Sequence, residues 1–116
     1  SRQDHPAGQP AIATGFDALR GRSDADLRAE FADYATLGAR LLRTDLNWHL
    51  VQDAGRDRWD WSAPDRVVRL ARAAGLDVLF VAGSVPHWAR KMPGEHSALA
   101  DPADYARFLT AAVTRY

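Results

Sequence analysis

The chain has 116 residues, of which 47% are hydrophobic, and its 15 basic residues balance its 15 acidic ones. That length suits one small domain or a part of a larger one, and the hydrophobic content excludes an intrinsically disordered chain. The balanced charge argues against nucleic acid as a partner, and the absence of cysteine excludes disulfides, zinc–thiolate sites, iron–sulfur clusters and thiol catalysis.

The polar opening, residues 1–10, is expected to form an amino-terminal tail or a linker. The sequence begins with Ser1 rather than Met, which indicates removal of the original amino terminus and favours a secreted or extracytoplasmic location. Further along, no apolar run approaches the roughly 18 residues that predict a membrane span. The globular part is therefore expected to be residues 11–116.

Three expected helix starts lie 39 residues apart, at Ser23, Ser62 and Asp101. Each places a capping side chain first and a carboxylate three residues later, where it can answer the amides of the first turn. Two equal intervals indicate a repeating unit. Gly38 and Gly75 are expected to end the first two helices in the left-handed conformation. The expected apolar faces of the three helices are, in order, Leu27, Phe31, Tyr34 and Leu37; Val67, Leu70, Ala71 and Ala74; and Tyr105, Phe108, Leu109, Ala112, Val113 and Tyr116.

A short apolar run precedes each helix and predicts strands at residues 11–16, 41–46 and 76–82. The four consecutive apolar residues at 78–81 predict burial on both faces of the third strand, as in a parallel sheet. The resulting order β-α-β-α-β-α fits two architectures, a doubly wound open sheet and a (β/α)8 barrel.

The loops distinguish these two architectures. Residues 15–21 hold neither the glycine fingerprint of a dinucleotide site nor a phosphate loop, which argues against a nucleotide-binding open sheet. About 13 residues separate Trp48 from Ser62, and about 15 separate Pro86 from Pro102. Long polar and aromatic loops after the strands, with short glycine turns before them, are typical of a barrel enzyme. The expected fold class is α/β, a (β/α)8 TIM barrel of which about the first three β-α units are present.

Polar and aromatic side chains gather at the carboxyl ends of the second and third expected strands, where a barrel places its binding cleft. The candidate substrate-binding residues are Arg43, Asp45, Asn47, Trp48, His87, Trp88 and Glu95. Structural alternatives are an ion pair between Arg43 and Asp45, capping of the strand end by Asp45 and Asn47, and packing of the two tryptophans in the core.

Two further groups of residues favour a structural role. Trp59 and Trp61 are expected to fix their loop as a hydrophobic staple, with substrate contact as the alternative. Three histidines, His49, His87 and His96, could gather around a metal ion. No helical or strand spacing brings them together, so no metal site is expected.

Five motifs stand in order along the chain: Arg43-Thr-Asp-Leu-Asn-Trp48, Trp59-Asp-Trp-Ser-Ala-Pro-Asp-Arg66, Ala74-Gly-Leu-Asp-Val-Leu79, Val85-Pro-His-Trp-Ala89 and Asp101-Pro-Ala-Asp-Tyr-Ala-Arg-Phe108. Together they resemble the opening third of a clan A glycoside hydrolase, most closely family 39 and related cellulase-like enzymes. The resemblance implies a (β/α)8 barrel that hydrolyses β-linked sugars with retention, using one glutamate as acid/base and another as nucleophile, without a cofactor. It also implies that Arg43 helps to keep the nucleophile ionised.

The chain departs from that family in its glutamates. The resemblance implies an acid/base after an Asn at the end of the fourth strand and a nucleophile at the end of the seventh. This sequence has only Glu30, expected on a solvated helix surface, and Glu95, and neither matches a catalytic position. We therefore expect no catalytic residue, no hydrolysis by this chain alone, and a partner in the remainder of the barrel. The alternative is a non-catalytic α/β fragment that binds carbohydrate weakly or complements another chain.

Overall fold

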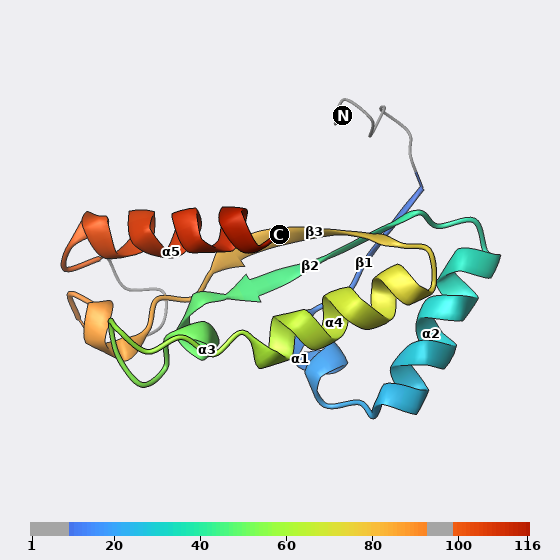
Figure 1. Cartoon of the computed structure of the whole chain (residues 1–116), viewed down its shortest axis with the longest axis horizontal. Coiled ribbons are helices and arrows are strands. Elements are labelled where there is room, and N and C mark those ends of the chain that lie inside the picture. Colours follow the sequence, from blue (N-terminus) through green and yellow to red (C-terminus); the bar gives the residue numbers. More distant parts are fainter. Residues whose placement is uncertain (1–9, 93–98) are drawn as a thin grey trace. The chain divides into compact units, whose positions relative to one another are not determined.

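The computed structural model describes residues 10–92 and 99–116, so residues 1–9 of the expected tail and Glu95 lie outside the described residues. Figure 1 shows the elements in space. In chain order they are β1 (Ala11–Ala13), α1 (Phe16–Arg20), α2 (Asp24–Thr36), β2 (Leu41–Asn47), α3 (Trp48–Val51), α4 (Ser62–Ala73), β3 (Asp77–Gly83), the one-turn helix η2 (His87–Ala89) and α5 (Pro102–Arg115). None of these helices is long and apolar enough to cross a membrane.

The chain forms two compact units. The first, which we call the sheet unit, holds the described residues up to Asp45 together with Ser62–Val81. The second, which we call the aromatic unit, holds Leu46–Trp61 and the described residues from Ala82 onward. All four tryptophans of the sequence belong to the aromatic unit.

A parallel sheet in the order β1-β2-β3 is the basis of the sheet unit. Ala11 of β1 is opposite Leu41 of β2, and Ala13 is opposite Arg43, so the two strands start level with each other. Helices alternate with these strands along the chain, as expected. The α/β class with a parallel sheet is therefore confirmed.

Helices α1, α2 and α4 cover one face of this sheet (Figure 1). Leu42 and Thr44 of β2 are buried on that face, and α4 packs against both α2 and α1. The guanidinium of Arg66 in α4 donates to the carboxylate of Asp24 in α2 and to the backbone carbonyl of Arg22. The buried apolar residues of the sheet unit are Phe16, Leu19, Leu27, Phe31, Ala39, Leu42, Val67, Val68, Leu70, Ala71 and Leu76.

The opposite face of the sheet is open. Leu79 and Val81 of β3 are 49% and 42% exposed, and Arg43 and Asp45 of β2 are exposed beside them. The expectation that residues 78–81 are buried on both faces is therefore wrong. In a closed barrel, side chains from the other strands fill the space inside the sheet. The described residues of the sheet unit contribute three strands, which leaves this inner face uncovered.

The starts of α2 and α5 and the turns after α2 and α4 follow the expected chemistry, whereas Ser62, expected as a cap, is the first residue of α4. The Ser23 hydroxyl accepts a hydrogen bond from the amide three residues later at 3.1 Å, and the Asp101 carboxylate accepts one from the amide two residues later at 3.0 Å. Gly38 and Gly75 have φ angles of +101° and +87°, which confirms their left-handed conformation. Leu37 was expected on the apolar face but is 82% exposed, because α2 ends one residue before it.

Three short helices, α1, α3 and η2, differ from the expected strands and loops. The first strand ends at Ala13 instead of continuing to Phe16, because α1 starts at Phe16 and buries that ring together with Leu19. Each of the three helices has five residues or fewer. Segments of this length are too short for hydrophobic periodicity to separate a helix from a strand or loop.

Candidate functional site

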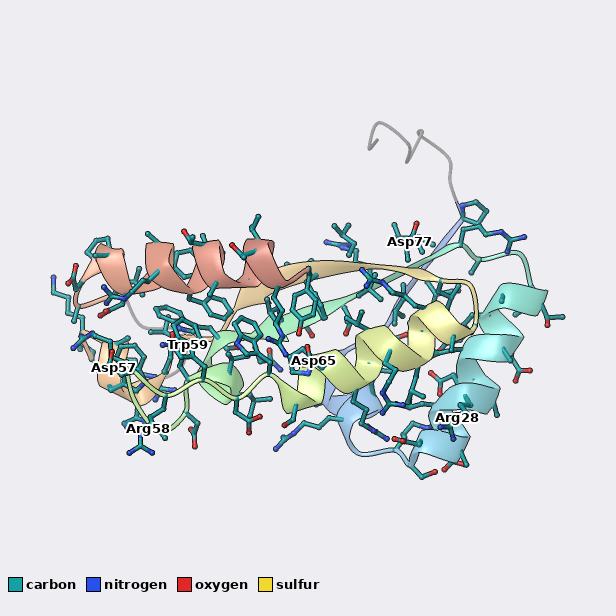
Figure 2. All side chains as sticks on the ribbon, viewed as in Figure 1. Arg28, Asp57, Arg58, Trp59, Asp65 and Asp77 are labelled. Carbon is teal, nitrogen blue, oxygen red and sulfur yellow. The ribbon has the colours of Figure 1, made fainter. Side chains whose placement is uncertain are left out.

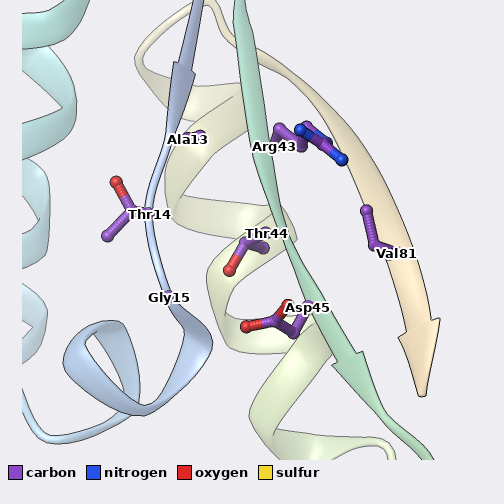
Figure 3. Close-up of a pocket in the computed structure, with 7 residues that line it drawn as sticks. All are labelled: Ala13, Thr14, Gly15, Arg43, Thr44, Asp45 and Val81. Atoms are coloured by element: carbon purple, nitrogen blue, oxygen red, sulfur yellow. The ribbon is translucent and has the colours of Figure 1, made fainter.

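A hollow of about 290 Å³ opens beside the carboxyl end of β1 in the sheet unit (Figure 3). We call it the sheet hollow; its lining residues are Ala13, Thr14, Gly15, Arg43, Thr44, Asp45 and Val81. Figure 3 shows the Asp45 side chain directed toward the turn after β1 and the Arg43 side chain directed toward β3. Ligands of α/β proteins bind at the carboxyl ends of parallel strands, so this hollow is the natural candidate site of the sheet unit.

Asp45 fixes the start of α1. Its Oδ2 accepts a hydrogen bond from the backbone amide of Phe16 at 3.2 Å. The N-cap of α1 is Gly15, which has no side chain that could accept this bond, so a carboxylate from β2 satisfies the amide instead. The predicted structural role was capping of the strand end, and the structure shows the carboxylate capping the start of a helix instead. The same contact fixes the direction of a carboxylate that lines the hollow.

Arg43 reaches the same hollow with its guanidinium available. The side chain is exposed and makes no hydrogen bond or ion pair with any residue that the structure describes. The alternative role, an ion pair with Asp45, is therefore not found among the described residues. The backbone of Arg43 is held, because its carbonyl accepts a hydrogen bond from the amide of Thr14 at 3.0 Å. A fixed backbone with a free guanidinium offers up to five N–H donors to a ligand.

Glu30 belongs to the helical layer and is not a solvated surface group, so that expectation is wrong. Its side chain is 16% exposed and pairs with Arg22 at 2.6 Å through Oε1. The other oxygen, Oε2, accepts a hydrogen bond from the Tyr34 hydroxyl. Burial, and then the hydrogen bond with Glu30, raise the pKa of Tyr34. Both carboxylate oxygens of Glu30 are thus used in structural contacts.

Trp48 lies in the core of the aromatic unit. It is fully buried, with its ring 5.4 Å from that of Phe108 in a stacked arrangement and 5.2 Å from that of Tyr105. Its Nε1 donates to Oε1 of Gln52 at 2.6 Å. No face of the ring is open to a sugar, so the structure favours the packing alternative. The helix α3 begins at Trp48 and turns the indole inward, an effect that the expected strand and loop did not include.

Trp88 is half-buried and held by polar contacts. Its Nε1 donates to the backbone carbonyl of Gln52 at 2.6 Å, and its ring meets that of Trp48 edge-on at 6.1 Å. The guanidinium of Arg56 lies 5.2 Å from the Trp88 ring centroid, a cation–π geometry. A sugar at Trp88 would therefore meet an indole whose N–H is already hydrogen-bonded to Gln52 and whose ring already contacts the Arg56 guanidinium.

A buried ion pair that was not expected joins the loop after α3 to α5. Asp104 is 1% exposed and accepts two hydrogen bonds from Arg56, at 2.6 and 2.9 Å, while Arg107 donates to it at 2.5 Å. The hydrogen bond from Arg56 is the main cause that lowers the pKa of Asp104. Asp104 was expected to answer the amides of its own helix. Arg107 is a local partner, but Arg56, which donates two of the three hydrogen bonds, is 48 residues away, and no local pattern indicates that contact.

The remaining described candidates, Asn47 and His87, do not line the sheet hollow. Asn47 is half-buried at the end of β2 and makes no side-chain capping bond to α3. His87 is exposed at the start of η2, where it lines a shallow hollow with Arg90, Lys91 and Met92. Glu95 and His96 lie outside the described residues. Within the described ranges, no group of three or more His, Asp or Glu side chains is placed to hold a metal ion.

Comparison with known proteins identifies the fold. No family model matches the chain, and no curated protein matches it either. Among solved structures, it is similar to the catalytic domain of a beta-amylase from Paenibacillus polymyxa, with 19% identity and a TM-score of 0.55. The likeness covers 85% of this chain and 23% of that domain, so the chain spans about a quarter of the protein it matches. That domain is a TIM-barrel glycoside hydrolase, and the likeness confirms the expected fold class, a partial (β/α)8 barrel.

Proposed function

We propose that this chain supplies one wall of the substrate cleft of a glycoside hydrolase acting on β-linked oligosaccharides or polysaccharides. The fold supports this proposal because a glycoside hydrolase domain shares it. The observation that carries it is Arg43, whose exposed guanidinium has no partner among the described residues and lines the sheet hollow beside the Asp45 carboxylate. Both groups face the open side of the sheet, which corresponds to the inside of a barrel.

The two side chains suit a sugar in complementary ways. A guanidinium donates hydrogen bonds and a carboxylate accepts them, so together they can bind adjacent hydroxyls of one ring. Asp45 is pre-positioned by the Phe16 amide, which reduces the entropy lost when a ligand binds. The hollow therefore binds and orients a sugar.

Bond cleavage is assigned to groups outside the described residues. Retaining hydrolysis requires two carboxyl groups about 5–5.5 Å apart, and among the residues that the structure describes Asp45 is the one carboxylate that lines the sheet hollow. We propose a retaining, family 39-like reaction whose two glutamates come from later strands of the barrel. In that arrangement Arg43 would stabilise the ionised form of the nucleophile through a charged hydrogen bond. No catalytic residue and no cofactor are assigned to this chain.

A second candidate function is a non-catalytic fragment that complements another chain. The exposure of Leu79 and Val81 favours it, since exposed apolar side chains side by side on a sheet mark a surface that gains stability when covered. The partner of this surface would be the remaining strands of the barrel. Both candidates place carbohydrate at the sheet hollow, and they differ in whether the assembled barrel hydrolyses it.

Binding of a β-linked hexasaccharide tests the proposal. We expect cellohexaose to bind the 116-residue chain weakly and measurably by isothermal titration calorimetry, and Arg43→Ala to weaken that binding about tenfold by removing charged hydrogen bonds. Arg28→Ala is the matched control, because Arg28 is an exposed arginine on α2, outside the sheet hollow (Figure 2). Equal affinity of the two variants would contradict the role of Arg43. Stronger binding of maltohexaose than of cellohexaose would contradict the β-linked substrate class.

A further inference from the structure

A second hollow, of about 330 Å³, lies in the aromatic unit on the loop between α3 and α4. We call it the Trp59 hollow; its lining residues are Leu50, Val51, Asp53, Ala54, Arg58, Trp59 and Asp60. Figure 2 labels Trp59 and Arg58 on this loop, together with Asp57, which does not line the hollow. From residues 53–60, the lining takes one aromatic ring, Trp59, two carboxylates, Asp53 and Asp60, and one guanidinium, Arg58.

Trp59 is held rigidly from one side. Its ring lies 5.8 Å from that of Trp61 with an interplanar angle of 6°, and Trp61 stacks in the same way on Phe108 at 6.1 Å and 6°. Trp59 nevertheless stays 38% exposed. Because one face rests on Trp61, the opposite face is the one that solvent or a ligand can reach. The stack fixes the direction of that face before any ligand arrives.

The backbone of the loop is also fixed. The amide of Asp60 donates to the carbonyl of Val51 at 2.7 Å, and the amide of Arg58 donates to the carbonyl of Gly55 at 3.1 Å. Gly55 has a φ angle of +148°, a conformation that side-chain-bearing residues rarely adopt. The polar side chains of the hollow are thus carried on a backbone with little freedom to lose on binding.

A hydrophobic staple alone does not account for this arrangement. A hydrophobic staple needs an aromatic ring that packs against the rest of the unit. Trp61 meets this need, because its ring packs against those of Phe108 and Tyr116. Trp59 adds an exposed flat surface, beside which Asp53, Arg58 and Asp60 lie. A sugar ring has the complementary chemistry, since its C–H face packs on an indole and its hydroxyls bond to planar polar groups at the rim.

We propose that the Trp59 hollow is a second carbohydrate-binding site, which takes one pyranose ring on the exposed face of Trp59. The proposal rests on the proposed function for the class of ligand, and its residues are entirely separate from those of the sheet hollow. Trp59 provides the stacking surface, and Asp53, Arg58 and Asp60 provide the hydrogen-bonding rim.

The test is a titration of the 116-residue chain with cellohexaose, followed through the four indole N–H signals in heteronuclear NMR spectra. We expect the Trp59 signal to shift in a saturable way. Trp59→Ala should weaken the binding that the remaining loop amides report about tenfold, and Trp59→Phe, which keeps a stacked ring, should weaken it less. Asp53→Asn should weaken it several-fold, whereas Asp57→Asn, on the same loop but outside the hollow, should leave it unchanged.

The outcomes separate this proposal from the proposed function. Arg43→Ala should leave the Trp59 shift intact, because Arg43 does not line this hollow. If the loop amides report the same cellohexaose affinity in the unaltered chain, in Trp59→Phe and in Asp53→Asn, the second site is refuted. That result would leave the proposed role of the sheet hollow untouched. A Trp59 signal that does not move with cellohexaose, or that moves only with tetramethylammonium as a cationic probe, refutes it too.

Discussion

At the scale of single residues, the aromatic unit is organised around polar contacts of Gln52, Arg56 and Asp104. Gln52 accepts from the Trp48 indole through its side chain and from the Trp88 indole through its backbone, so both tryptophans have partners for their N–H groups. The Gln52 side-chain amide in turn donates to the Arg56 carbonyl at 2.8 Å. These contacts fix the loop from which Arg56 reaches the buried Asp104 carboxylate.

Asp104→Asn tests that ion pair. The substitution removes a buried charge that accepts from two arginines, and we expect it to lower the free energy of unfolding by about 1–3 kcal/mol. Urea denaturation followed by tryptophan fluorescence is the measurement, since all four tryptophans lie in the aromatic unit. Asp101→Asn is the control, because asparagine caps a helix about as well as aspartate. Equal unfolding midpoints for Asp104→Asn and the unaltered chain would contradict the structural role.

Acidification should act on the same carboxylate. Its pKa is lower in the folded state than in the unfolded chain, where it is about 3.9, so the ionised form stabilises the fold. This contribution is complete above the unfolded pKa and is lost as pH falls through the lower folded pKa. The stability difference between the unaltered chain and Asp104→Asn should therefore be constant above about pH 5 and shrink below about pH 4. A difference that stays constant to lower pH would show that Asp104 does not carry it.

At the scale of elements, capping and turn chemistry explain why the long helices were predictable. Ser23, Asp101, Gly38 and Gly75 act within their own turns, so a local pattern contains all the information needed. The amino-terminal end of α1 could not be predicted in this way. Its amide is satisfied by Asp45, which is 29 residues away in sequence, and the contact exists only once β1 and β2 are paired.

Gly38→Ala tests the turn that ends α2. A methyl group at this position would meet no atom within 4 Å, so any cost comes from the backbone, whose φ of +101° disfavours a side chain. We expect a loss of stability of about 1–2 kcal/mol, measured by urea denaturation with far-UV circular dichroism. Gly21→Ala is the matched control, because Gly21 has a φ of −80° and only an ordinary contact at 3.7 Å. If both substitutions had the same effect, backbone strain at Gly38 would not be the cause.

At the scale of the whole molecule, the sequence predicted the α/β class, the parallel sheet and the barrel-like order of units, because these depend on apolar runs that repeat along the chain. It predicted burial of Leu79 and Val81 because a run of apolar residues indicates a strand covered on both sides. The run is consistent with a complete barrel, and the chain spans 23% of the barrel domain it matches. Burial depends on neighbours that a local pattern does not contain.

The candidate site shows the same limit. Strand alternation places Arg43 and Asp45 on the exposed face of β2, opposite the buried Leu42 and Thr44. Alternation does not indicate that another element holds Asp45 and leaves Arg43 free. It also does not exclude Trp48 as a substrate-binding residue, because the burial of Trp48 follows from the turn into α3. Long-range contacts therefore decide which polar groups remain available for a ligand.

The most direct test of the central claim is to map the cellohexaose-binding surface of the sheet unit by heteronuclear NMR. If the open face of the sheet is the substrate side, the amides of Thr14, Arg43 and Asp45 and the Arg43 side-chain N–H should shift together and saturate with one affinity. Arg43→Ala should move saturation of the Thr14 and Asp45 amide shifts to an about tenfold higher cellohexaose concentration, while Arg28→Ala should leave it unchanged. Saturable shifts confined to residues of the covered helical face, or no saturable shift at the sheet hollow, would contradict the claim.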